Sequence, residues 1–174
     1  MRGAPAAGPR LMARVMWLAA ALVLAAGLAG GMTGHARAEA ACREDSVFLR
    51  GDWGEARFSV EIADTVRERA QGLMFRESMG KSHGMLFIYQ QPTFVSFWMK
   101  NTLIPLDMIF LDGRGVVRRV HSMAVPGDLT PIPGGDDILA VLEINGGLAR
   151  RMGIAEGSEM RHPAFGRAAA WPCE

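Results

Sequence analysis

The run from Phe97 to Asp107 contains residue types suited to binding a small ligand. Lys100, Asn101 and Asp107 provide a cation, an amide and a carboxylate around a predicted turn, and Trp98 adds an aromatic plane. Such a set can hold a small polar or anionic ligand, with the indole as a stacking wall. The structural alternative is that Asp107 pairs with Lys100 while Asn101 bonds its own turn. Asp107 opens an otherwise apolar run, so its carboxylate needs a partner under either interpretation.

Two arginines and a glutamate form a second candidate set. Arg69 and Arg76 flank the end of a predicted helix, and Glu143 interrupts an apolar strand. Buried charges usually occur in pairs, so an arginine–carboxylate ion pair is the simpler interpretation. The functional interpretation is an anion clamp, because a guanidinium binds oxyanions through two parallel hydrogen bonds. We therefore add Arg69 and Glu143 to the candidate ligand-binding residues.

Two His-x-Met pairs raise the possibility of copper binding. His83 precedes Met85 and His121 precedes Met123, in predicted strands, where positions i and i+2 share a face. Imidazole with thioether suits Cu(I), but methionine at apolar strand positions is usually core filler. The pairs also stand far apart in the sequence, so copper binding is the least favoured function and no metal site is predicted.

An enzyme is the second function class. The sequence has no Gly-x-Ser-x-Gly elbow and no His-Glu-x-x-His motif. His121 can be a base oriented by Asp107, with Ser122 or Thr102 as a nearby hydroxyl, but spacing alone does not show that they meet. The catalytic residues therefore stay unassigned, and no cofactor is predicted.

The first 38 residues have the three parts of a secretory signal peptide. Three arginines precede an apolar run over residues 15–29, and the small-residue site Ala36-Arg37-Ala38 follows. The run is shorter than the roughly 20 residues that cross a bilayer comfortably. We expect cleavage after Ala38 and a periplasmic or secreted protein without a stable membrane span. An uncleaved anchor is the alternative.

Charge and cysteine content narrow the function classes further. The four arginines before Ala38 leave 15 of the 19 basic side chains, against all 18 acidic ones, for the rest of the chain. This net charge of −3 argues against a basic nucleic-acid surface. The two cysteines, Cys42 and Cys173, lie near the ends of the exported segment. An even count in an oxidising compartment predicts a disulfide between them.

Hydrophobic patterning predicts seven or eight strands. Alternation of apolar and polar residues indicates a half-buried strand, and short apolar runs bounded by turn residues indicate buried ones. Asp112-Gly113 between two such runs is a strong hairpin signal. The predicted strands include residues 57–63, 84–89, 94–99, 106–111, 116–121, 138–144 and 158–162.

Two short helices complete the predicted domain. Thr65-Val66-Arg67-Glu68 has the form of a capping box and predicts a helix over residues 66–73. Asn145 is expected to cap a second helix, in which Leu148 and Met152 share a face. The chain lacks a βαβ rhythm, so the fold class is α+β, an antiparallel-rich small β-barrel of seven or eight strands with two short helices. The domain is predicted over residues 57–162, after an N-terminal extension (39–56) and before a C-terminal tail (163–174).

Several motifs in this order resemble the DUF192 (UPF0127) family over roughly residues 58–161. They are Arg69-Ala70-Gln71-Gly72-Leu73-Met74, Gly84-Met85-Leu86-Phe87, Phe97-Trp98-Met99-Lys100-Asn101-Thr102, Pro105-Leu106-Asp107, Phe110, and the stretch from Val141-Leu142-Glu143 to Gly147. The resemblance implies a small β-rich domain, often exported, with no established activity. We therefore predict an exported single-domain binding or accessory module for a small polar or anionic ligand. The alternative is an enzyme acting on a small periplasmic substrate from the same pocket.

Overall fold

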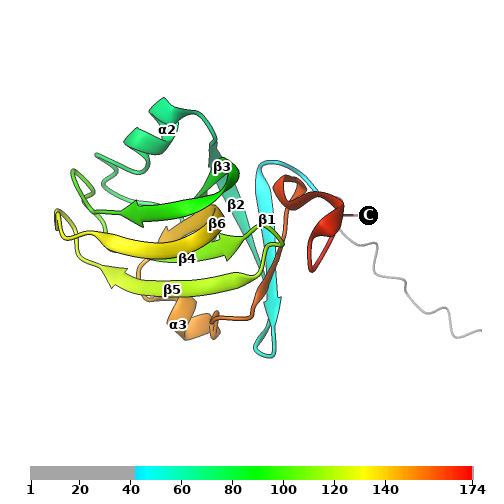
Figure 1. Cartoon of the computed structure of the whole chain (residues 1–174). Helices are drawn as coiled ribbons and strands as arrows, with labels where there is room; N and C mark the ends of the chain where they lie inside the picture. Colours follow the sequence, from blue (N-terminus) through cyan, green and yellow to red (C-terminus); the bar gives the residue numbers. More distant parts are fainter. Residues whose placement is uncertain (1–41, 174) are drawn as a thin grey trace, which may run out of the picture. The chain divides into compact units, whose positions relative to one another are not determined.

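The computed structural model describes residues 42–173, so the predicted signal peptide lies outside the described residues. Residues 42–173 form a seven-stranded sheet with the order β5-β4-β6-β3-β2-β1-β7 (Figure 1). The strands are β1 (Ser46–Gly51), β2 (Gly54–Ala63), β3 (His83–Phe97), β4 (Leu106–Asp112), β5 (Val117–Ala124), β6 (Ile132–Asn145) and β7 (Glu159–Arg161). The helices are α2 (Val66–Gln71), α3 (Leu148–Met152) and the 3-10 helix η1 (Pro163–Ala168). Over this range no helix combines the length and the apolar character needed to cross a bilayer.

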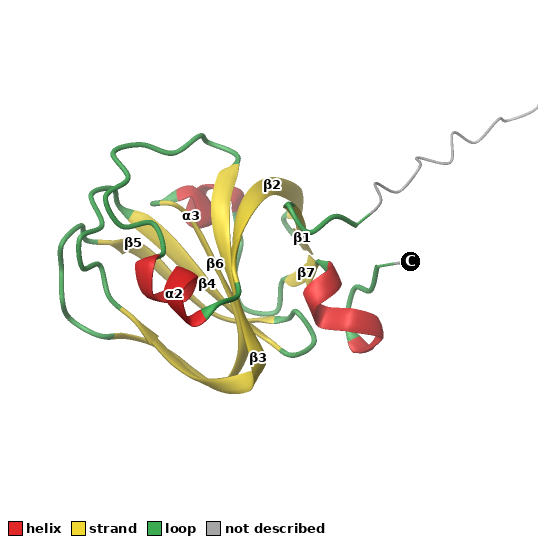
Figure 2. Cartoon of the chain, turned by 90° about the horizontal axis from the view of Figure 1, so that it is seen from above, coloured by secondary structure: helices red, strands yellow, loops and turns green. Residues whose placement is uncertain are grey.

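The sheet is a curled half-barrel, so the predicted small barrel is wrong in closure (Figure 2). The sheet is antiparallel-rich as predicted, but it is mixed, because one of its strand pairings is parallel. β2 and β3 pair in parallel, and α2 lies in the connection between them. Parallel neighbours need such a crossover, which a hairpin cannot supply. The edge strands β5 and β7 do not pair along their length. Among the described residues one isolated bridge, between Val116 and Glu159, joins these two edges.

The predicted capping box starts α2. The Thr65 hydroxyl accepts a hydrogen bond from the Glu68 N–H at 3.2 Å, and the Glu68 carboxylate accepts one from the Thr65 N–H at 3.1 Å. These two bonds satisfy donors that the first helical turn leaves unpaired. The helix ends at Gly72, where the backbone takes a positive φ of 50°. The chain then turns toward β3.

The two strands predicted over residues 84–89 and 94–99 are largely one strand, β3. Its register against β6 shifts three times between Ile88 and Ser96, a stretch that includes Pro92. Proline cannot donate to a ladder and is tolerated at such irregularities. The polar residues around it are exposed. The polar break in the sequence therefore marks a bulged segment of one strand and not a turn.

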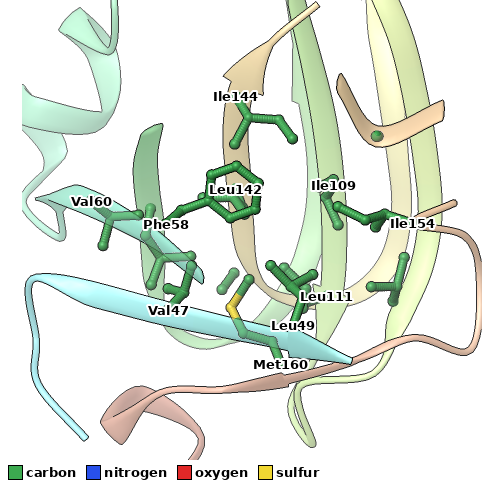
Figure 3. Packing of buried hydrophobic residues seen from close by; sticks show 14 of the residues in the cluster. Val47, Leu49, Phe58, Val60, Ile109, Leu111, Leu142, Ile144, Ile154 and Met160 are labelled. Atoms are coloured by element: carbon green, nitrogen blue, oxygen red, sulfur yellow. The ribbon is translucent and has the colours of Figure 1, made fainter. Parts of the chain in front are cut away.

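Alternation along the strands gives the sheet two apolar faces. The first packs β1 and β2 against β4, β6 and α3, with Phe58, Leu142 and Ile144 among its buried side chains (Figure 3). The second face carries Phe87, Met108 and Val141. In β6, Leu142 and Ile144 point to the first face, so Val141 and Glu143 point to the second. This alternation decides which candidate residues can meet.

The predicted disulfide joins Cys42 to Cys173, with the two Cα atoms 5.8 Å apart. The same end of the sheet holds a stacked arginine. The Arg161 guanidinium carbon lies 4.7 Å from the centroid of the Phe48 ring and 4.5 Å from that of the Trp171 ring. Aromatic faces attract the guanidinium charge. The C-terminal segment is therefore packed onto β1 as well as covalently tied.

Candidate functional site

Asp107 is fully buried, and its carboxylate is satisfied by backbone donors. Oδ1 accepts hydrogen bonds from the N–H groups of Met123 and Gly147, and Oδ2 accepts one from Ala149, all at 2.8 Å. Two of these donors belong to the start of α3, so Asp107 caps that helix from a neighbouring strand. The predicted cap, Asn145, instead donates to the carbonyls of Met79 and Gly80. Its role as the cap is therefore a wrong prediction.

The predicted grouping of Asp107 with Lys100 does not form. Asp107 shares the first face of the sheet with Ile109, whereas the loop that carries Lys100 covers the second face through Met99. The Lys100 side chain is exposed, and its ammonium lies 5.1 Å from the centroid of the Trp98 ring. Lys100 and Trp98 are thus neighbours, and Asp107 is separated from both by the sheet.

Asn101 acts through its backbone more than through its amide. Its φ is 55°, and its carbonyl accepts a hydrogen bond from the Phe75 N–H at 2.8 Å. Its side-chain amide donates to the sulfur of Met74 at 3.9 Å. Phe75 also has a positive φ, of 64°, which is rare for a bulky residue. Backbone outliers of this kind persist only where the surrounding structure holds them in place, and they are concentrated at functional sites.

A cavity of about 40 Å³ lies on the second face of the sheet, beneath Trp98. It lies between the end of α2, β3, β6 and the loop after β3. This volume accommodates a few waters or the head group of a larger ligand. Its lining includes Arg69, Met74, Phe97, Trp98, Thr102 and Glu143. Three of the predicted ligand-binding residues, Arg69, Trp98 and Glu143, therefore do line one cavity.

Glu143 is the unusual residue of this cavity. Its side chain is only 4% exposed, and the strand register places Met85 and Met108 on either side of it. Within residues 42–173 its carboxyl has no hydrogen bond and no ion pair. Burial raises the pKa of the Glu143 carboxyl to about 8. At neutral pH the group is therefore mostly a neutral acid with one O–H to donate.

Arg69 does not form the predicted ion pair with Glu143. Its Nη1 donates to the backbone carbonyls of Asp64 and Ile88, the latter at 2.8 Å. Its guanidinium carbon also lies 5.0 Å from the centroid of the Tyr89 ring. These contacts fix the guanidinium of Arg69, a residue that lines the cavity. A guanidinium has five N–H donors, so this arrangement leaves donors for a ligand.

Arg76 pairs with a residue that the sequence analysis did not single out. Its guanidinium bonds the carboxylate of Glu61, and His83 Nε2 lies 2.9 Å from the other oxygen of that carboxylate. Burial alone would raise the pKa of Glu61, but the hydrogen bonds from His83 and Arg76 outweigh it and lower this pKa. The sequence signal for Glu61 was its position between Val60 and Ile62, because the alternation of a strand places its side chain on the opposite face from theirs.

The two His-x-Met pairs lie on strands that are not neighbours. His83 is on β3 and His121 is on β5, with β6 and β4 between them. In residues 42–173 no three His, Cys, Asp or Glu side chains are grouped closely enough to hold a metal ion. His121 also pairs in register with Met108, which faces away from Asp107. The suggested base and orienter, His121 and Asp107, therefore point to opposite faces of the sheet.

The fold and the cavity define a single small mixed β-sheet domain with one buried acid at a potential ligand site. The chain belongs to the DUF192 family, described as an uncharacterized ACR, whose model matches residues 48–162. The predicted family resemblance is thereby confirmed.

Two solved structures share this fold. A protein of unknown function from Novosphingobium aromaticivorans DSM 12444 is 46% identical, over 66% of this chain and 82% of that chain, with a TM-score of 0.65. A putative transcription regulator from Sinorhizobium meliloti 1021 is 36% identical, over 70% of this chain and 95% of that chain, also with a TM-score of 0.65. No curated protein matches this chain.

Proposed function

We propose that this protein is an exported binding or accessory module that holds a small polar or anionic ligand in the cavity at Glu143. The observation that carries the proposal is the Glu143 carboxyl, which is buried, faces the cavity and lacks a partner within residues 42–173. Glu143 lines the cavity, so a ligand in it can accept the hydrogen bond of the neutral carboxyl.

The walls of the cavity suit a ligand with oxygen acceptors. Arg69 brings a positive charge, Thr102 brings a hydroxyl, and Trp98 presents its indole at 49% exposure. Polar groups that converge in an apolar cleft fix the orientation of a ligand. Lys100, whose ammonium lies 5.1 Å from the centroid of the Trp98 ring, adds a second positive charge beside this wall of the cavity. The proposed site therefore comprises Arg69, Trp98, Thr102 and Glu143, with Lys100 outside it.

Export is the second part of the proposal. It is supported by the signal-peptide pattern of the first 38 residues and by the disulfide between Cys42 and Cys173, which fits an oxidising compartment. N-terminal sequencing of the protein recovered from the periplasm or medium should begin at or near Glu39. Recovery of the chain with Met1 or Arg2 in the membrane fraction would contradict export as a cleaved protein.

Native mass spectrometry of protein purified from its own cell envelope tests the binding function. We expect a mass adduct that is retained in Lys100→Ala and lost in Glu143→Leu, because Glu143 lines the cavity and Lys100 does not. Glu61→Gln is the matched control, since it alters a carboxylate on the same face of the sheet but outside the cavity. Equal adducts in wild type and Glu143→Leu would place the ligand elsewhere.

An enzyme working from the same cavity is the second candidate function. One observation favours it, because a carboxyl with a pKa near 8 is poised to exchange a proton at neutral pH. The Thr102 hydroxyl at the wall, which donates to the Lys100 carbonyl at 3.4 Å, has no base beside it among the described residues. Chemical conversion of the co-purified compound on incubation with the protein would favour an enzyme over a binding module.

A further inference from the structure

We infer that the ligand of the Glu143 cavity is a monocarboxylate with an apolar substituent. Its carboxylate accepts the hydrogen bond of the Glu143 carboxyl beside Arg69, and its apolar part lies on the surface formed by Phe75, Trp98 and Leu103. This inference rests on the proposed function of the cavity, and it names the chemical class of the ligand. We call the three apolar residues the rim.

The head group follows from the donors that the cavity offers. A neutral Glu143 supplies one O–H, and Arg69 supplies the N–H groups of Nε and Nη2, beyond those of Nη1 that bond the Asp64 and Ile88 carbonyls. An O–H donor to an ionised oxygen makes a short and strong hydrogen bond, roughly twice as strong as a neutral pair. The two carboxyl groups then share one proton, and the guanidinium balances the remaining negative charge. A carboxylate fits this set better than an alcohol or an amide.

An ammonium head group fits less well. It would need Glu143 to be ionised on a face that it shares with Phe87 and Met108, and burial there disfavours the charge. It would also face the positive charge of Arg69. Arg69 in the lining and Lys100 beside Trp98 are both positive and favour the approach of an anion.

The apolar part follows from the size of the cavity and the character of its surroundings. A space of about 40 Å³ takes a carboxylate and little more, so any substituent must leave through the opening. Phe75 and Leu103 directly follow the lining residues Met74 and Thr102, and they are 67% and 53% exposed. Exposed apolar side chains next to a cavity can extend its binding surface. Together with Trp98 they offer a hydrocarbon chain a place to lie.

The rim is held in place by backbone hydrogen bonds between loops. The Phe75 N–H bonds the Asn101 carbonyl, the Met99 N–H bonds the Asp128 carbonyl at 2.8 Å, and the Gly127 N–H bonds the Met99 carbonyl at 3.1 Å. A surface organised before binding loses less conformational entropy when the ligand arrives. The positive φ of Phe75 and Asn101 is part of this arrangement, since it directs the two loops toward each other.

The other titratable groups around Glu143 are not expected to control ligand binding. Tyr89 interacts electrostatically with both Arg69 and Glu143, and it stays neutral because burial raises its pKa. The cluster of Glu61, Arg76 and His83 lies beyond Met85, one strand away, and its charges are paired with one another. From α2 Arg69 faces the cavity, and Lys100 lies outside it on the loop after β3. Glu143 is therefore the group whose protonation should govern binding.

NMR titration of the full chain at pH 6.5, followed at the Trp98 indole N–H, tests the ligand class. The probes are acetate, hexanoate, hexanamide and hexylamine. We expect hexanoate to bind roughly tenfold more tightly than acetate, because its four extra methylenes lie half-buried on the rim. Hexanamide and hexylamine should bind more weakly than hexanoate. Above a pH of about 8 hexanoate binding should weaken by about tenfold per pH unit, as Glu143 loses its proton.

Three variants separate the inference from a general effect on the fold. Glu143→Gln keeps an N–H donor in a side chain of the same shape, so this variant should bind hexanoate at pH 6.5. Its affinity for hexanoate should not decline above pH 8. Glu143→Leu should weaken binding at least tenfold, and Glu61→Gln should leave it unchanged. Binding of hexylamine or hexanamide without hexanoate would overturn the ligand class and leave the proposed binding function standing. No response to any probe would overturn the ligand class, and a mass adduct that Glu143→Leu retains would overturn the proposed binding function as well.

Discussion

Replacement of Asp107 by Asn should destabilise the domain far more than its single-atom change suggests. In the structure Oδ1 accepts from Met123 and Gly147 and Oδ2 accepts from Ala149. An amide keeps one oxygen for the first two donors. It then points an N–H group at the Ala149 N–H, because the amide nitrogen takes the place of Oδ2. One buried donor loses its acceptor and meets another donor.

The size of the effect follows from the number of bonds changed. A hydrogen bond to a charged group contributes about 1.5–3 kcal/mol, and an unpaired buried donor costs about 1–3 kcal/mol. We therefore expect Asp107→Asn to lower the free energy of unfolding by about 3 kcal/mol, and Asp107→Leu, which removes all three acceptor contacts, by more. With a urea m-value of about 1–3 kcal/mol/M, the midpoint should fall by at least about 1 M.

Asp112→Asn is the matched control for this experiment. Asp112 also accepts two backbone hydrogen bonds, from Arg114 at 2.8 Å and Val116 at 3.0 Å, but both end on the same oxygen. Asparagine can keep that oxygen in place, so its urea midpoint should change little. An Asp107→Asn protein with a midpoint within about 0.3 M of wild type would refute the reasoning, because the capping of α3 from β4 would then contribute nothing measurable.

Three further changes are expected to have measurable effects. Thr65→Ala should lower stability by about 1 kcal/mol in thermal melts, because it removes the cap of α2. Reduction of Cys42–Cys173, or Cys173→Ser, should lower the unfolding free energy by about 4–5 kcal/mol, since the bond closes a loop of more than a hundred residues. The raised pKa of Glu143 means that the folded state keeps a proton that the unfolded chain releases. The unfolding free energy of the wild type should therefore fall by roughly 1 kcal/mol per pH unit between pH 5 and 8 relative to that of Glu143→Gln. Urea denaturation over this pH range measures both proteins, and an equal pH dependence of the two would contradict the expectation.

Local features of the fold were the predictable ones. The capping box at Thr65 and the hairpin at Asp112 each involve hydrogen bonds between residues at most four apart, so the sequence pattern contains the interaction itself. The parallel pairing of β2 with β3 is different, because alternation of apolar residues is the same for either strand direction. Strand β1 escaped prediction because four successive residues, 46–49, are buried, which leaves no period of two to detect.

The candidate site was predicted in part. Trp98, Arg69 and Glu143 line one cavity, and the apolar strand around Glu143 correctly indicated a buried acid. The need of Asp107 for a partner was also correct. Its partners could not be named, because they are backbone N–H groups up to 42 residues away, and a backbone donor carries no sequence signature. Pairing rules based on side-chain charge therefore assigned Lys100 to a carboxylate that it does not contact.

The disulfide turns the oxidised domain into a covalent ring, with consequences for how it folds. β1 pairs with β7 across more than a hundred residues, for example Phe48 with Arg161. In a linear chain this contact needs the closure of a long loop, which raises contact order and slows folding. In the oxidised chain Cys42 and Cys173 keep the two strands near each other even when unfolded. The timing of oxidation relative to folding thus decides whether β7 joins the sheet early, as a neighbour already in place, or last, as the free end of a chain.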